Sequence, residues 1–181
     1  MVRGEKEKIT ALVLTVAVLA ISCSELEASR YAVGRDATFL DRMVYSFIHA
    51  SFLHALLNSW SLIVIVFYFN VSICTMAMAY IIAVAYPAET LSHVVGMAGE
   101  PTVGLSAVCF ALLGSVGFAV RRRIYFNMCI MACIFMGPAV SRLGTMMGLE
   151  MAFPNFVIHL YAYAMGLVVS FFNMPAPWKR K

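Results

Sequence analysis

The feature that most constrains the fold is a series of apolar stretches, each long enough to form a helix within a membrane. Only 12% of the 181 residues are charged and 62% are hydrophobic, whereas a soluble domain carries about a quarter charged residues. So few charges cannot cover a water-facing surface, and we expect lipid to cover much of the protein. The sequence predicts six membrane-spanning helices, over residues 9–24, 53–70, 71–86, 102–120, 124–140 and 153–174.

The second and third stretches are nearly continuous in the sequence. We divide them at Asn70, because one helix over both would be about 50 Å long, and the hydrocarbon core is only about 30 Å thick. The connection over residues 25–52 mixes charged and aromatic residues. It fits a partly buried amphipathic element at the outer membrane surface and a solvated loop equally well. We interpret residues 1–181 as a single all-α, polytopic membrane domain.

The N-terminal stretch has a second interpretation. Lys6 and Lys8 precede an apolar run that ends at Cys23, which is also typical of a signal peptide. The residues before Cys23 fit a cleavage site only loosely, and a retained first helix brings the number of spans to six. We therefore favour retention.

The distribution of positive charge predicts the orientation in the membrane. With six spans, both termini and the second and fourth connections lie on one side. The positive-inside rule then places both termini in the cytoplasm, as in a multi-pass protein of the bacterial inner membrane. Nine basic residues lie on that side and four on the other: Arg3, Lys6, Lys8, Arg121, Arg122, Arg123, Lys179, Arg180 and Lys181, against Arg30, Arg35, Arg42 and Arg142.

These short basic clusters, and not a continuous basic surface, make up the net charge of +4. They indicate a lipid bilayer as partner and no nucleic acid. The five cysteines lie mostly in apolar runs and form no CxxC motif. We expect them to pack in the protein, and we predict no metal and no cofactor.

A serine and a histidine are predicted to lie at the same depth in different spans. Ser106 precedes Arg121 by 15 residues, and His159 precedes Met174 by the same number. Both therefore lie about 22 Å from the inner boundary, which is around 8–10 Å below the outer surface of a core about 30 Å thick. The pair fits a hydrogen bond that holds helices together, a catalytic pair, or a metal or proton path.

Small residues surround both positions. Gly104, Ala107, Ala111 and Gly114 accompany Ser106, and such residues let helix backbones approach closely. Phe110 shares the face of Ser106, since it lies four residues later. In the last stretch, Ala162 and Gly166 form a small-xxx-small pair after His159. Close packing there would carry the imidazole towards the hydroxyl.

Two polar side chains in the second stretch project together. His54 and Asn58 are four residues apart. With the backbone N–H of Ser106 they are candidate donors to an oxyanion that develops during attack on a carbonyl. His49 lies off that face and nearer the surface, so we expect it to make a structural hydrogen bond.

Three motifs resemble those of the rhomboid family, in the same order along the chain. Residues 49–58 (HASFLHALLN) resemble the family's HxxxxHxxxN element, residues 104–114 (GLSAVCFALLG) its GxSG segment, and residues 159–166 (HLYAYAMG) its HxxGxxxG helix. The resemblance extends from about Met43 to the end of the sixth stretch. The chain departs from the family at Ala107 and Ala162, where glycine is usual, and it lacks the Trp-Arg pair of the first loop.

The resemblance implies an intramembrane serine endopeptidase with a Ser-His dyad and no cofactor. It implies Ser106 as the nucleophile, His159 as general base and acid, and His54 with Asn58 in the oxyanion hole. Single-span membrane proteins would be cut within or beside their spans through an acyl-enzyme.

Three alternatives stay open. A catalytically silent relative would bind or escort membrane clients. A metalloenzyme would use His49, His54 and His159, but the chain lacks the HExxH pattern. A transporter would be expected to show an inverted repeat, which the sequence lacks. The oligomeric state and the physiological substrate do not follow from the sequence.

Overall fold

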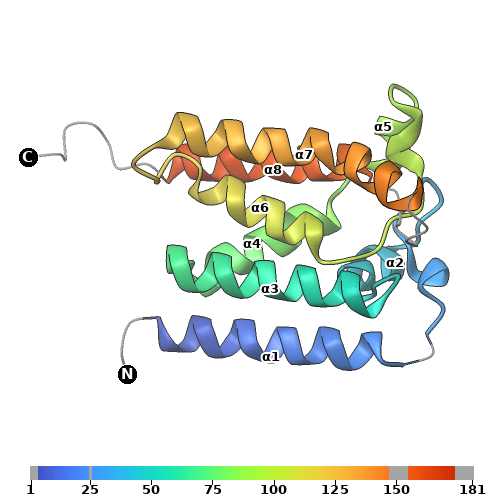
Figure 1. Cartoon of the computed structure of the whole chain (residues 1–181), viewed down its shortest axis with the longest axis horizontal. Coiled ribbons are helices and arrows are strands. Elements are labelled where there is room, and N and C mark those ends of the chain that lie inside the picture. The colour runs from blue at the N-terminus through green and yellow to red at the C-terminus, as the bar shows by residue number, and fades with distance from the viewer. Residues whose placement is uncertain (1–3, 25, 147–154, 174–181) are drawn as a thin grey trace, which may run out of the picture.

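The described part of the chain is built from helices. The computed structural model describes residues 4–24, 26–146 and 155–173 (Figure 1). These residues form no β-sheet, and only one isolated antiparallel bridge joins Val33 to Thr102. The predicted all-α fold is therefore confirmed.

Six principal helices correspond in order to the six predicted stretches. They are α1 (Glu5–Ser22), α3 (Phe52–Phe69), α4 (Ile73–Val84), α6 (Ser106–Val116), α7 (Arg123–Met146) and α8 (Phe156–Phe172). The predicted ends of the last stretch, Phe153 and Met174, lie outside the described residues. The break between α3 and α4 occurs at Asn70, which adopts a left-handed conformation with φ of 50°; this ends α3 where the sequence predicts a break.

The helices α6 and α7 differ most in length from their predicted stretches. The helix α6 begins only at Ser106, four residues later than predicted, because the preceding segment is extended: Thr102 pairs with Val33, and Gly104 has φ of +116°. The helix α7 continues past residue 140 and contains Pro138, which removes one backbone hydrogen bond without ending the helix.

The connection between α1 and α3 contains three short elements, η1 (Ala28–Tyr31), α2 (Phe39–Val44) and η2 (Tyr45–Phe47). A capping box starts α2: the Thr38 hydroxyl accepts from the Asp41 N–H, and the Asp41 carboxylate accepts from the Thr38 N–H. Phe39 is exposed, whereas Tyr45 is buried and its hydroxyl donates to the Ala83 carbonyl. This connection is thus a partly buried element rather than a solvated loop.

Helix packing places α6 in the middle of the bundle. It contacts α8 most extensively, and also α4 and α3, while α1 packs against α3 and α7 packs against α8 (Figure 1). Two further short elements, α5 (Ala88–Ser92) and η3 (Gly96–Gly99), lie between α4 and α6 in the chain. The central position of α6 surrounds it with side chains from three helices.

Large apolar side chains lie on the outside of the bundle as well as in its core. In water such a surface would be costly, and it is expected where lipid is the solvent. Exposed examples on α1, α3 and α7 are Val13, Val16, Leu53, Trp60, Ile124 and Met128.

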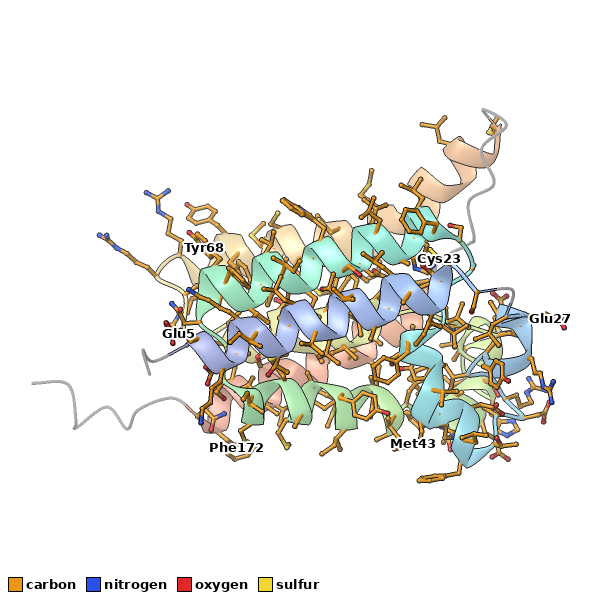
Figure 2. All side chains as sticks on the ribbon, turned by 90° about the horizontal axis from the view of Figure 1, so that it is seen from below. Glu5, Cys23, Glu27, Met43, Tyr68 and Phe172 are labelled. Atoms are coloured by element: carbon orange, nitrogen blue, oxygen red, sulfur yellow. The ribbon has the colours of Figure 1, made fainter. Side chains whose placement is uncertain are left out.

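Among the described helices, Phe52–Phe69 is long and apolar enough by length and composition to cross a membrane. Shorter apolar helical segments lie at Ile73–Val84, Ser106–Val116, Arg123–Ala139 and Phe156–Phe172. The start of α1 at Glu5 and the end of α8 at Phe172 lie at the same end of the bundle (Figure 2). An even number of crossings would produce this arrangement. Six crossings with cytoplasmic termini remain a prediction.

Candidate active site

Ser106 is the first residue of α6, and a short bent segment places it there. Gly104 has φ of +116°, which a residue with a Cβ rarely adopts. Its N–H donates to the Tyr45 carbonyl over 2.9 Å, and the Leu105 N–H donates to His49 Nε2 over 3.2 Å. Two hydrogen bonds from the first connection therefore hold the backbone on the N-terminal side of Ser106.

His159 lies in the second turn of α8 and faces Ser106. The distance between Ser106 Oγ and His159 Nε2 is 2.8 Å, which is a good hydrogen-bond length. Both residues are half-buried. The Phe110 ring packs against the imidazole, with the ring centroids 4.7 Å apart and the planes inclined by 34°. The hydroxyl donates to Nε2 when that nitrogen carries no proton.

The close crossing of α6 and α8 brings these two side chains together. A Cβ on Gly114 would meet the backbone of Tyr163 and Gly166, and a Cβ on Gly166 would meet the backbone of Ala111. Ala111 and Ala162 are fully buried. Four small residues therefore let two helix backbones touch, about two turns beyond the Ser106–His159 pair.

His54 and Asn58 lie beside the bend before Ser106. The Ser51 hydroxyl caps α3 and accepts from the His54 N–H over 3.2 Å. A Cβ on Gly104 would lie 2.9 Å from His54 Cε1 and 3.1 Å from Asn58 Nδ2. The Asn58 amide nitrogen is buried and has no hydrogen-bond partner among the described residues. A buried donor without an acceptor is costly, unless a bound group supplies one.

His49 is buried and connects the first connection to the Ser106 bend. Its Nε2 accepts from the Leu105 N–H, so the neutral ring carries its proton on Nδ1. Its ring meets that of His54 edge-on, with the centroids 5.0 Å apart. Burial, and secondarily the neighbouring His54, lower the pKa of His49 to about 4. The ring is therefore neutral at pH 7 and acts as an acceptor.

Metal binding has no support in the described part of the chain. Residues 4–24, 26–146 and 155–173 contain no cluster of three or more His, Cys, Asp or Glu side chains able to hold a metal ion. Cys109 is buried, and its thiol lies 3.7 Å from the Asn58 carbonyl. The other four cysteines are exposed on the surface of the bundle, although the sequence predicts packed positions for them. A helix in a membrane can present apolar and weakly polar side chains to lipid, so such residues need not be packed inside.

Several residues that position the site have no distinct sequence signal. Tyr45 contributes only a backbone carbonyl, and Leu105 only its N–H. Asn155 caps α8 by accepting from the Val157 N–H over 3.2 Å. Asn is a preferred residue at the N-cap of a helix, so the sequence could have predicted this role of Asn155.

The geometry agrees with one comparison with known proteins. A family model described as "Rhomboid domain" matches residues 37–176. The match covers the segment from just before α2 to just beyond α8, and it includes Ser106, His159, His54 and Asn58. Searches of curated proteins and of solved structures find no match to the chain.

Proposed function

The chain belongs to the rhomboid family, and from this premise we propose that it is an intramembrane serine endopeptidase. The family is embedded in membranes and acts on transmembrane proteins. We propose that this chain cleaves single-span membrane proteins within or next to their spans. The observation that carries the proposal is the 2.8 Å distance between Ser106 Oγ and His159 Nε2, which join α6 to α8.

In the proposed first half-reaction, Ser106 Oγ attacks the carbonyl carbon of the scissile bond while its proton passes to His159 Nε2. The C–N bond then breaks, and the imidazolium returns the proton to the leaving amine. The products are an acyl-Ser106 ester and the released C-terminal fragment. Phe110 stacks on the imidazole and so restricts the ring to the orientation that this transfer needs.

In the second half-reaction, water attacks the ester carbonyl and gives a proton to His159, which passes it to the departing Ser106 oxygen. Both steps place negative charge on the former carbonyl oxygen. We assign three donors to this oxygen: the Asn58 amide, which has no partner in the described part of the chain, the His54 ring and the Ser106 backbone N–H. His49, Gly104, Ala162 and Gly166 support these groups and take no part in the chemistry.

The decisive experiment is cleavage of a generic single-span substrate by the purified full-length protein in detergent. We expect product from the wild type and none from Ser106→Ala or His159→Ala. Ser115→Ala is the matched control, because Ser115 lies on the same helix and its hydroxyl donates to the Leu112 carbonyl within that helix. Unimpaired cleavage by Ser106→Ala would end the proposal.

A fluorophosphonate probe tests the same nucleophile without a substrate. Labelling of the wild type that Ser106→Ala abolishes supports the peptidase. A wild type that is folded, unlabelled and inactive on every substrate would instead indicate a silent relative that binds membrane clients.

A further inference from the structure

Three consecutive arginines lie at the end of the α6–α7 connection and at the first position of α7. Arg121, Arg122 and Arg123 are all exposed. The chain has no Asp or Glu from residue 101 to residue 149, so no acidic neighbour in the sequence balances them. The start of α1 lies at the same end of the bundle (Figure 1) and carries two glutamates and two lysines, whose charges cancel. The arginines therefore leave an excess of positive charge at this end.

Aromatic rings lie beside these arginines, where the end of α3 meets the start of α7. Phe69 and Phe126 pack edge-on, with the centroids 5.8 Å apart, and the Tyr68 ring lies 4.8 Å from Phe69. Tyr68 and Tyr125 are 77% and 74% exposed. Figure 2 shows Tyr68 at this end of the bundle, near long nitrogen-tipped side chains that extend beyond the helices.

Below the two tyrosines the surface becomes apolar. Val64 lies one turn before Tyr68 on α3, and Met128 lies one turn after Tyr125 on α7; both are exposed. A molecule that meets the arginines and tyrosines with its polar end would therefore meet exposed apolar side chains with the rest. This order of charge, aromatic ring and apolar side chain follows the order of phosphate, interface and hydrocarbon in a bilayer.

We propose that Arg121, Arg122, Arg123, Tyr68 and Tyr125 bind the headgroup of an anionic phospholipid. A guanidinium group can donate two parallel hydrogen bonds to the oxygens of one phosphate, and tyrosine hydroxyls at the interface supply further donors. The exposed Val64 and Met128 favour a lipid over nucleic acid or a soluble phosphate, because only a lipid brings acyl chains to cover them. The proposal does not depend on peptidase activity.

Native mass spectrometry of the full-length protein tests the proposal. The protein is extracted from bilayers of equal parts phosphatidylglycerol and phosphatidylcholine, and the retained lipids are counted. Replacement of all three arginines by Gln should lower phosphatidylglycerol retention by at least about tenfold, since each cation near the headgroup adds to the attraction. Phosphatidylcholine retention should not change.

The matched control removes three positive charges elsewhere. Replacement of Lys179, Arg180 and Lys181 by Gln changes the net charge equally and should lower phosphatidylglycerol retention much less than the arginine variant does. Equal retention by the wild type and the arginine variant would overturn the proposal, and so would an equal loss in both variants. If the arginine variant does not fold, the wild type decides: its preference for phosphatidylglycerol should fall several-fold in about 0.5 M salt, and an unchanged preference would overturn the proposal.

Discussion

At the scale of residues, the proposed chemistry depends on how a few polar side chains are held. Ser106 Oγ and His159 Nε2 lie 2.8 Å apart although 53 positions separate them in the chain. On one side Phe110 stacks on the imidazole. On the other, His49 holds the backbone just before the serine. The pair is therefore oriented by neighbours that do not themselves react.

Asn58 provides a test of the proposed oxyanion hole. Its buried amide nitrogen has no partner among the described residues, so it is free to bind the oxygen that becomes negative. We expect Asn58→Ala to lower the rate of cleavage about 10²–10³-fold, the usual effect of removing one such donor. The measurement is turnover of the single-span substrate at saturating concentration.

Ser59→Ala is the control for Asn58→Ala. Ser59 is the next residue on α3 and is also buried. Its hydroxyl likewise has no hydrogen-bond partner among the described residues, but it has no role in the proposed chemistry. Its variant should keep wild-type turnover. Equal losses in both variants would assign the effect to packing and remove Asn58 from the oxyanion hole.

His49 makes the stability of the site depend on pH. The unfolded ring takes up a proton near pH 6.5, whereas the folded ring, which lies outside the spanning helices, has a pKa of about 4. Acidification through this window therefore favours the unfolded chain, and protonation of Nε2 removes the acceptor for the Leu105 N–H. The stabilisation by His49 is complete above pH 6.5 and is lost towards pH 4.

We expect His49→Gln to unfold at a lower temperature than the wild type at pH 7, with the difference narrowing as the pH falls from 6.5 to about 4. Thermal unfolding of both proteins in detergent measures it. A difference that stays constant across this range would show that the neutral imidazole does not carry the stabilisation.

At the scale of elements, the contact between α6 and α8 positions the two reactive side chains. Gly114 and Gly166 allow backbone-to-backbone contact, and the Ser170 hydroxyl on α8 accepts from the Phe118 N–H just beyond α6. The helix α7 is joined to both: Tyr163 donates to Asn127, and Asn127 donates to the Gly117 carbonyl. Hydrogen bonds therefore stabilise the packing of α6, α7 and α8 on the side of the bundle away from the site.

Gly114→Val tests the importance of the close crossing. The new side chain would collide with the backbone of α8, which cannot move without separating the helices. Overpacking of this kind costs about 1–3 kcal/mol or more, so we expect a lower unfolding temperature and little labelling of Ser106 by a fluorophosphonate. Gly96→Val is the control, because a Cβ there meets nothing within 4 Å. Wild-type labelling of the Gly114 variant would show that the site tolerates separated helices.

At the scale of the whole molecule, the cluster of basic residues and the candidate active site lie at opposite ends of the bundle. Ser106 begins α6 and His159 lies near the start of α8, whereas the α6–α7 connection with its arginines lies at the end where α1 starts (Figure 1). The start of α1 and the end of α8 lie at the same end as these arginines (Figure 2). The positive-inside rule would place it in the cytoplasm and the site towards the outer surface.

Reporter fusions test this orientation. A fluorescent protein that matures only in the cytoplasm should be bright at either terminus, and alkaline phosphatase, which requires export, should be inactive at both. A fusion within the α5–η3 segment, after Gly96, should give the opposite pattern. Termini that report different sides would exclude six crossings.

The sequence by itself determined the helical class, the approximate positions of the six principal helices and the side chains that could take part in catalysis. Helix-forming apolar runs are local properties, so composition and spacing reveal them. The helix α6 begins four residues after the start of its predicted stretch, because the extended segment before Ser106 is set by pairing with Val33 and by the Tyr45 carbonyl, which are distant in the chain. Only the tertiary structure decided that Ser106 meets His159 and that His54 and Asn58 lie against Gly104. Equal depth allows such contacts, but the helix crossing angle and the backbone approach determine whether they form.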